Sequence, residues 1–219
     1  MEAPRAGSLA RRISETTVRR LSLYLRILEE VERVGTGTIS SEELAERAAT
    51  TAAQVRKDLS LFGSFGKRGL GYAVPELAGE LREILGLDRP WRVALVGAGR
   101  IGSALFEYPG FRHRGFEIVA VLDADPGKRG TEWGGVAVQD IAELERVVAS
   151  EKVDIVILAV PAEAAPDIAA RVVATGVKGI LNFAPMQLRV PPDVAVQDVN
   201  MVMELEALSF ALSQAGRGS

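Results

Sequence analysis

One stretch of the chain, residues 92–123, constrains its fold more than any other. An apolar run leads into Gly-Ala-Gly-Arg-Ile-Gly at 97–102, and a second apolar run ends on Asp123. In a strand–turn–helix–strand unit the first glycine makes the tight turn, the second lets the backbone approach a pyrophosphate, and the third lets the helix pack on the strand. The N–H groups and the dipole at the helix start attract phosphates. The pattern therefore predicts a Rossmann-type dinucleotide site.

Asp123 narrows the choice of dinucleotide. Its carboxylate is placed to accept hydrogen bonds from a ribose 2′-hydroxyl and to repel a 2′-phosphate, which favours NAD(H) over NADP(H), although Lys128 and Arg129 are nearby cations that argue the other way. The cofactor contacts predicted from this stretch are Gly97, Ala98, Gly99, Arg100, Ile101, Gly102 and Asp123. The alternative is a glycine-rich turn that binds another nucleotide or coenzyme A.

From Trp91 onward, strand patterns alternate with helix patterns. This alternation predicts an α/β fold with a doubly wound parallel sheet. Val160 and Pro161 follow one of the predicted strands at the edge where such sheets bind ligands, so they are predicted cofactor contacts, with plain strand termination as the alternative. We expect strands at 92–96, 117–122, 153–159, 178–182 and 194–198, a further short one at 136–138, and helices at 100–107, 140–149, 162–175 and 202–214.

The composition excludes several kinds of chemistry. The 219 residues include no cysteine, which excludes disulfides, thiolate nucleophiles and zinc held by cysteine, and which fits a reducing, cytoplasmic location. The single histidine, His113, lies between two arginines and is typical of a solvated loop, so we expect no metal site. We find no secretory signal and no apolar run that could span a membrane. The net charge of −3 does not indicate a nucleic-acid binder, so that function must rest on local patterns.

The N-terminal part of the chain has helical patterns throughout. An apolar stripe at three- and four-residue spacing predicts one long helix over about 16–34. Two capping boxes, Ser40-x-x-Glu43 and Thr51-x-x-Gln54, then predict short helices at 42–48 and 52–62. Two short helices joined by a brief turn have the dimensions of a helix-turn-helix.

The second short helix and the segment after it carry side chains suited to DNA. Glutamine and basic side chains read base edges or hold phosphates, and a glycine-rich hairpin at 64–72 would act as a wing. The alternative is a small helical bundle with a solvated charged face. The predicted DNA contacts are Gln54, Arg56, Lys57 and Asp58 on the helix, of which Gln54, Lys57 and Asp58 are expected to point most outward, and Lys67 and Arg68 near the hairpin tip.

Segments in both halves of the chain resemble one family. The N-terminal segments Ser-Ser-Glu-Glu-Leu-Ala-Glu at 40–46, Thr-Ala-Ala-Gln-Val-Arg-Lys-Asp-Leu-Ser at 51–60 and Phe-Gly-Lys-Arg-Gly-Leu-Gly-Tyr at 65–72 resemble the winged-helix domain of Rex, the bacterial redox-sensing repressors. The resemblance continues through Leu-Val-Gly-Ala-Gly-Arg-Ile-Gly at 95–102, Tyr-Pro-Gly-Phe at 108–111, Leu-Asp-Ala-Asp-Pro at 122–126 and Gly-Ile-Leu-Asn-Phe-Ala-Pro at 179–185. It implies a homodimer that represses respiratory and fermentation genes at palindromic operator DNA. NADH releases such repressors, and NAD⁺ favours their DNA-bound form.

The resemblance also implies a switch that links ligand to DNA. In some family members an arginine on the first helix, the tyrosine of Tyr-Pro-Gly-Phe and an aspartate before the C-terminal helix form a network. Arg26 and Tyr108 match the first two, and Tyr108 is also a predicted cofactor contact. The third position is Asn200, an amide that hydrogen-bonds but cannot pair as a carboxylate, which departs from the electrostatic form of the network.

The domain organisation follows from these patterns. We predict a flexible arm at 1–13, a winged-helix DNA-binding domain at 14–85, a Rossmann NAD(H)-binding domain at 86–200 and a dimerisation helix at 201–219. The C-terminal helix either packs on its own sheet or is lent to a partner subunit, and the resemblance favours exchange.

Three further functions stay open from the residues alone. The first is a small NAD-dependent oxidoreductase, which needs an acid or base beside the nicotinamide. We find no such constellation in the sequence, so we predict a regulator rather than an enzyme. The second is a coenzyme A-binding protein, and the third is a DNA-binding module with an empty Rossmann scaffold.

Overall fold

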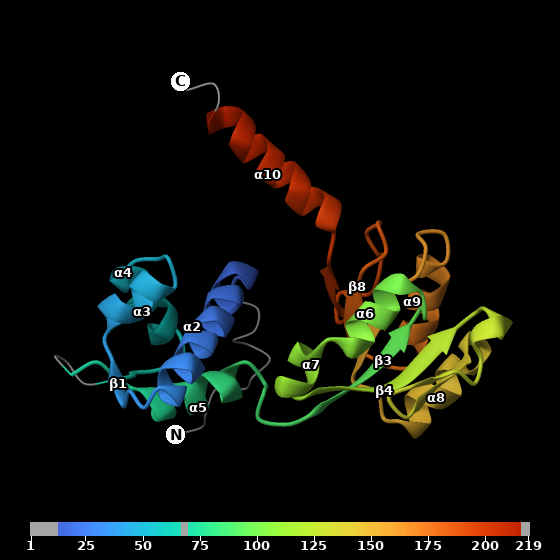
Figure 1. Ribbon diagram of the computed structural model, residues 1–219, viewed down its shortest axis with the longest axis horizontal. Helices are drawn as coiled ribbons and strands as arrows, with labels where there is room; N and C mark the ends of the chain where they lie inside the picture. Colours follow the sequence, from blue (N-terminus) through green and yellow to red (C-terminus); the bar gives the residue numbers. More distant parts are fainter. Residues whose placement is uncertain (1–12, 67–69, 216–219) are drawn as a thin grey trace. The chain divides into compact units, whose positions relative to one another are not determined.

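The computed structural model describes residues 13–66 and 70–215 of the chain (Figure 1). The chain divides into two compact units, one that ends at Arg89 and one that begins at Pro90. Each unit has a hydrophobic core of its own. Except for Ile13, the predicted arm at 1–13 lies outside the described residues.

The N-terminal unit is a helical bundle with one small sheet. Its helices are α2 (Glu15–Arg33), α3 (Ser41–Arg47), α4 (Ala52–Ser60) and α5 (Val74–Ile84), and its strands are β1 (Thr38–Ile39) and β2 (Tyr72–Ala73). Large apolar side chains from each of these helices fill the core, among them Leu21, Leu25, Leu28, Leu44, Val55, Leu59, Leu77 and Leu81. Burial of such side chains is the main stabilising contribution to a bundle of this size.

Local signals explain where these helices begin. Ser40 accepts a hydrogen bond from the backbone N–H of Glu43, and the Glu43 carboxylate accepts one from the Ser40 N–H, so the predicted capping box is confirmed. Thr51 caps α4 by accepting from the N–H of Gln54. The Gln54 side chain does not return to this cap, so the second capping box is only half formed.

The strand after α4 pairs with a segment that precedes α3. The strand β2 pairs with β1 in an antiparallel register, Thr38 opposite Ala73 and Ile39 opposite Tyr72. The backbone partner of Tyr72 therefore comes from β1, the strand before α3. A local pattern could not show this, because the pairing spans more than thirty residues of sequence. Residues 67–69 lie outside the described residues, so the hairpin at 64–72 stays a prediction.

The C-terminal unit contains a seven-stranded sheet in the order β5-β6-β4-β3-β7-β8-β9. Its strands are β3 (Trp91–Val96), β4 (Phe116–Asp123), β5 (Glu132–Trp133), β6 (Val136–Asp140), β7 (Ile155–Leu158), β8 (Gly179–Asn182) and β9 (Ala195–Asp198). All neighbouring pairs are parallel except β5 with β6, which forms an antiparallel edge. The order reverses at β3, because β4 and β6 lie on one side of it and β7, β8 and β9 on the other. The predicted doubly wound parallel sheet is confirmed.

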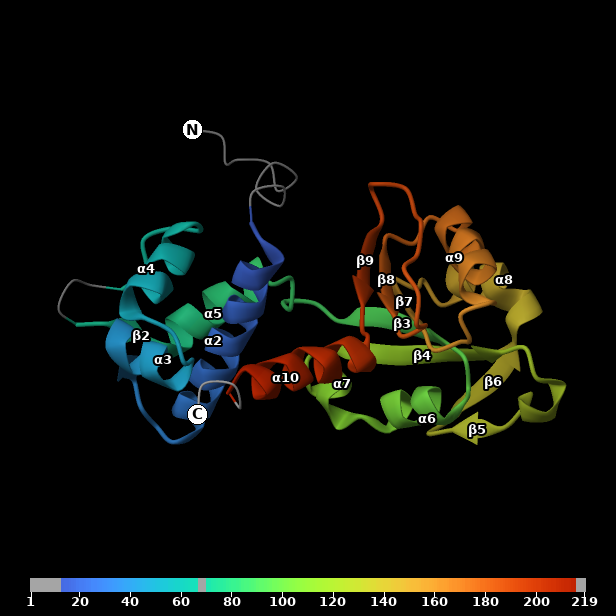
Figure 2. The ribbon, with the colours of Figure 1, turned by 90° about the horizontal axis from the view of Figure 1, so that it is seen from above.

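Helices cover both faces of this sheet (Figure 2). The helices α8 (Leu144–Ser150) and α9 (Ala165–Ala174) pack against one face, where alternate strand residues such as Val96 and Leu158 point. The helices α6 (Arg100–Glu107) and α7 (Pro109–His113) pack against the other face, where Leu95 and Ile157 point. Two short 3₁₀ turns, Pro126–Lys128 and Ile141–Glu143, complete the connections.

The last helix, α10 (Met201–Ala215), has no buried side chain from residue 201 to residue 214. Large apolar side chains lie on several sides of it, namely Met201, Val202, Met203, Leu205, Leu208, Phe210 and Leu212, each more than half exposed. At 100° per residue, Met203 and Phe210 lie on the side opposite Leu205 and Leu212. The helix is therefore apolar on more than one face.

Candidate dinucleotide and nucleic-acid sites

A crevice of about 900 Å³ opens at the carboxyl ends of the parallel strands of the C-terminal unit. Its walls come from the β3–α6 turn, from the residues after β4 and β7, from the loop after β8 and from α9. This is the edge of the sheet, and the reversal point of the strand order, at which doubly wound folds bind their ligands.

The glycines of the β3–α6 turn are required for two different close approaches. Gly97 has a φ of +107°, and a Cβ built on it would lie 2.3 Å from the carbonyl oxygen of Ala159. A Cβ on Gly102 would lie 1.9 Å from the carbonyl oxygen of Gly97. A Cβ on Gly99, by contrast, meets no described atom within 4 Å. Gly97 and Gly102 therefore hold the turn together, whereas the space beside Gly99 faces the crevice.

Asp123 is fixed at the end of β4 by backbone and side-chain donors. Its carboxylate accepts hydrogen bonds from the N–H of Ala98 at 2.6 Å and of Asp125 at 2.8 Å, and Lys128 Nζ lies 3.1 Å from Oδ2. Burial raises the pKa of this carboxyl, but the donors from Asp125, Lys128 and Ala98 outweigh burial, and the net pKa lies below its usual value. The group is therefore ionised at neutral pH and lines the crevice as an anion.

The structure brings most of the predicted cofactor contacts together. Those that line the crevice are Gly97, Gly99, Arg100, Ile101, Asp123, Val160 and Pro161. Ala98 and Gly102 do not line it, because both are buried in the turn beneath. Tyr108 does not line it either.

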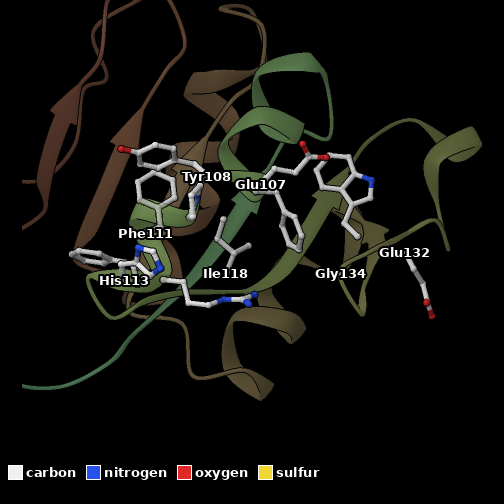
Figure 3. A pocket seen from close by; sticks show the side chains of 12 residues that line it. Glu107, Tyr108, Phe111, His113, Ile118, Glu132 and Gly134 are labelled. Atoms are coloured by element: carbon white, nitrogen blue, oxygen red, sulfur yellow. The ribbon is translucent and has the colours of Figure 1, made fainter.

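Tyr108 lies instead in a second pocket of about 520 Å³ on the α6–α7 side of the sheet (Figure 3). Its ring meets Phe111 edge to face, with ring centroids 5.3 Å apart, and His113 lies in the same pocket. Tyr108 is 55% exposed. Tyr108 therefore does not line the crevice within the described chain, and its contact with the dinucleotide stays a prediction.

Several crevice residues lie outside the predicted set. Phe183 and Pro185 come from the loop after β8, and this loop is held by the fully buried Asn182. The Asn182 amide donates to the carbonyl of Met186 and to Asp198, and its oxygen accepts from the N–H of Ala184. The remaining members are Val96, Ala124, Asp125, Lys128, Ile141, Ala159, Ala164, Asp167, Ile168 and Arg171. Only the order of the strands could have shown that β8 ends, and α9 begins, beside the crevice.

On α4 of the N-terminal unit, the predicted DNA contacts have different surroundings. Lys57 is exposed and makes no ion pair within the described residues. Arg56 is exposed as well, but its guanidinium donates to Ser41 Oγ at 2.7 Å and lies 3.0 Å from Glu42. Lys57 is thus the α4 cation that is available to a phosphate, while Arg56 links α4 to α3.

Asp58 corrects one of the predicted DNA contacts. It is 1% exposed, and its carboxylate faces α2 and not the outer surface of the helix. The Arg20 guanidinium donates to both carboxylate oxygens, at 2.6 and 2.7 Å, and Tyr24 Oη donates at 3.0 Å. The helical wheel predicted an outward side chain because it contains no information about where α2 lies. Asp58 joins the two helices and cannot contact DNA.

The region of the predicted wing is described only at its ends. Lys67 and Arg68 lie outside the described residues, so their contact with DNA stays a prediction. A Cβ on Gly66 would lie 2.5 Å from the carbonyl oxygen of Gly71, and one on Gly71 would lie 2.5 Å from that of Ile39. Both glycines have positive φ values, so this close approach requires glycine at both positions.

The three predicted switch residues are all accessible in part. Arg26 is exposed on α2, and Tyr108 is exposed beside α7. Asn200 is half-buried, and its side-chain oxygen accepts from the N–H groups of Val202 and Met203. Asn200 therefore has a local role in starting α10, which an aspartate could also fill.

The described residues contain no group of three or more His, Cys, Asp or Glu that could hold a metal ion. Within the same part of the chain, no helix is long and apolar enough to cross a membrane.

A helix-turn-helix unit and a dinucleotide crevice in one chain define a class of protein, the transcription regulator with a nucleotide-binding domain. The chain is 50% identical over 199 residues to the redox-sensing transcriptional repressor Rex of Carboxydothermus hydrogenoformans, covering 91% of this chain and 96% of the relative. It is also 50% identical to the repressor of the same name from Thermus thermophilus, over 92% and 94% of the two chains. The chain belongs to the Rex family of redox-sensing transcriptional repressors.

Solved structures and family models agree with this assignment. The crystal structure of RSP in complex with β-NAD⁺ and operator DNA has a TM-score of 0.89 at 39% identity, over 93% of this chain and 94% of that one. The complex of RSP with β-NADH has a TM-score of 0.84 at 37% identity, over 93% and 96%. Residues 12–60 match the family model "Putative DNA-binding protein N-terminus", and residues 88–186 match "CoA binding domain".

Proposed function

We propose that this repressor binds palindromic operator DNA as a homodimer and that NADH, bound in the crevice of the C-terminal unit, releases it. The observation that carries the proposal is the crevice itself, in which the glycine turn and an ionised Asp123 meet at the reversal point of the sheet. The related repressor RSP has been crystallised with β-NAD⁺ and operator DNA and with β-NADH.

The chemistry of the two cofactors supports a switch. NAD⁺ carries a positive charge on its nicotinamide ring, and NADH does not. Burial of an unpaired charge is costly, so a crevice with apolar walls such as Ile101, Val160 and Phe183 favours the reduced ring. A ligand shifts a conformational equilibrium only by its difference in affinity for the two states. We infer that NADH favours a closed dimer whose recognition helices no longer match the spacing of the DNA grooves.

The proposal assigns roles to residues in both units. Gln54 and Lys57 on α4, with Lys67 and Arg68, contact the operator. Arg26, Tyr108 and Asn200 link the cofactor to DNA affinity, with Asn200 acting through a hydrogen bond. The exposed apolar side chains of α10 favour its burial in the homodimer, because monomers seldom expose so large an apolar surface. Sedimentation at micromolar concentration tests the proposed homodimer. A particle with the mass of a single chain would contradict it.

The protein turns over no substrate in this proposal. Because residues 88–186 match the CoA binding domain, coenzyme A is a second candidate ligand. Trp91 and Trp133 both belong to the C-terminal unit, so their fluorescence can be titrated with NADH, NADPH and coenzyme A. Saturation by coenzyme A alone would favour that second candidate.

The decisive experiment measures operator affinity with and without NADH, and NADH affinity with and without operator. Linkage requires the two ratios to be equal, and a coupling of about 1–3 kcal/mol is usual. A Gly99→Ala variant sharpens the test, because its Cβ meets no described atom and its φ of −85° suits any residue.

We expect Gly99→Ala to fold and to bind the operator normally, but to lose release by NADH. Gly79→Ala is the matched control: it too meets no described atom within 4 Å, and it lies on α5 in the other unit. It should respond to NADH like the parent chain. Equal NADH affinities in the presence and absence of operator would overturn the switch.

A further inference from the structure

The amide of Gln54 is held in one orientation by a buried carboxylate. Gln54 lies in the first turn of α4, four residues before Asp58, and its Nε2 lies 2.7 Å from Asp58 Oδ1. Asp58 is 1% exposed, whereas Gln54 is half-buried and keeps an accessible part. The contact thus joins a side chain at the surface to one in the core.

The hydrogen bond between Gln54 and Asp58 allows only one of the two orientations of the Gln54 amide. An ionised carboxylate only accepts hydrogen bonds, so the atom of Gln54 that faces it must be the NH₂ group. Burial raises the pKa of the Asp58 carboxyl, but hydrogen bonds from Arg20, Gln54 and Tyr24 outweigh burial, and the pKa lies below its usual value. Asp58 therefore stays an acceptor at neutral pH, and the opposite amide orientation would set two oxygens against each other.

The rest of the cluster holds Asp58 in place. Arg20 forms a bidentate pair with the carboxylate, and Tyr24 donates to one of the same oxygens. Both come from α2, so the orientation of the Gln54 amide is set by a helix that lies thirty or more residues away in sequence. One N–H of Gln54 is committed to Asp58, which leaves its carbonyl oxygen and its second N–H for a ligand.

We propose that Asp58 is a positioning residue for base recognition, and that it makes Gln54 select a base whose major-groove edge presents a donor. Adenine fits best, because its N6 amine donates to the Gln54 oxygen while its N7 accepts from the second N–H. Cytosine N4 offers the donor alone. Guanine and thymine present only acceptors at this edge, so they can take the second N–H of Gln54 but leave its carbonyl oxygen without a donor, and they are disfavoured. The inference rests on the proposed contact of α4 with the operator.

The test requires an operator, which can be selected from a random DNA pool with the full-length protein. Every position of one half-site is then changed to each of the four base pairs, and affinities are measured for the parent chain and three variants. Asp58→Asn keeps the shape but can donate as well as accept. Gln54→Met removes the amide and leaves Asp58 in place. Tyr24→Phe removes a different hydrogen bond to Asp58, and it is the matched control.

We expect the parent chain to prefer adenine at one half-site position by about tenfold over guanine or thymine. Gln54→Met should abolish that preference at that position alone. Asp58→Asn should reduce it to within about twofold, because the amide can then turn over. Tyr24→Phe should keep the preference, even though it loses a hydrogen bond of the same cluster. A merely structural role of Asp58 would not give this difference between the two variants.

The ways in which the inference can fail are distinguishable. Unchanged base preference in a folded Asp58→Asn, or a Gln54-dependent preference for guanine or thymine, would overturn the inference. If Asp58→Asn does not fold, the base chosen by the parent chain and lost in Gln54→Met decides the question. Lys57→Ala tests the proposed function separately. If neither Lys57→Ala nor Gln54→Met changes binding to any DNA sequence, α4 is not the helix that contacts the operator.

Discussion

Among the described residues, each unit contains one buried aspartate whose pKa lies below its usual value, and these two aspartates differ in the groups that surround the carboxylate. Asp58 accepts only from side chains, those of Arg20, Tyr24 and Gln54. Asp123 accepts from two backbone N–H groups and one lysine, and it lines a crevice. The Asp58 side chain is 2% exposed, against 11% for Asp123.

This difference separates a structural carboxylate from one that can meet a ligand. Side-chain donors surround Asp58, from two residues on α2 and from Gln54 on its own helix α4. The donors from α2 join the two helices, and both carboxylate oxygens have their partners within the fold. At the end of β4, the backbone N–H groups of Ala98 and Asp125 hold the Asp123 carboxylate in place. The residue still lines the crevice, where a ligand can reach it. Both aspartates have a lowered pKa, so a pKa shift alone would not distinguish them.

The largest expected effect is on stability, from Asp58→Ala. Loss of the carboxylate leaves the Tyr24 hydroxyl and the Arg20 side chain, which is 25% exposed, without this acceptor, which typically costs about 1–3 kcal/mol. We expect the far-UV circular dichroism transition in urea to move to lower concentration. The tryptophan fluorescence transition should not move, because Trp91 and Trp133 report on the C-terminal unit.

Glu42→Ala is the matched control in the same unit. It breaks the pair between Glu42 and Arg56, whose side chains are 68% and 55% exposed. Exposed pairs contribute at most about 1 kcal/mol, so the change should be small. Equal effects of the two variants would show that Asp58 is not the structural carboxylate described above.

The next effect is on cofactor choice, from Asp123→Asn. The variant keeps a hydrogen-bond acceptor but removes the charge that opposes a 2′-phosphate, and it frees Lys128 to pair with that phosphate. We expect the ratio of NADPH to NADH affinity, measured by calorimetry, to rise about tenfold, or ~1.4 kcal/mol. Asp140→Asn is the control, because Asp140 lies opposite Asp123 on the next strand and pairs with Arg129 outside the crevice. An unchanged ratio in Asp123→Asn would disprove the assigned role.

The smallest expected effect is the acid dependence of stability. The folded pKa of Asp58 lies below its unfolded value of about 3.9, so its contribution is present above about pH 4 and is lost as the pH falls through the folded pKa. We expect the dichroism melting temperature of the parent chain to fall more steeply below pH 4 than that of Asp58→Asn. Parallel pH profiles would mean that Asp58 has the same pKa in both states.

The sequence alone determined the features that depend on neighbouring residues. The Ser40–Glu43 capping box and the glycine turn at 97–102 were predictable because their donors, acceptors and close contacts lie within a few residues of each other. The alternation of strands and helices likewise predicted the doubly wound sheet, since apolar periodicity decides which face of each element is buried. Asp123 was predictable because it ends the strand after that turn.

Only the tertiary structure decided which outward-looking positions are in fact buried. The wheel of α4 placed Asp58 outside, but α2 packs over that position and supplies Arg20 and Tyr24 from 38 and 34 residues away. Phe183 and Pro185 reach the crevice only because β8 lies beside β7 in the sheet. Hydrogen bonds and packing between distant segments depend on how whole helices and strands are arranged in space. The local periodicity of the sequence gives no information about that arrangement.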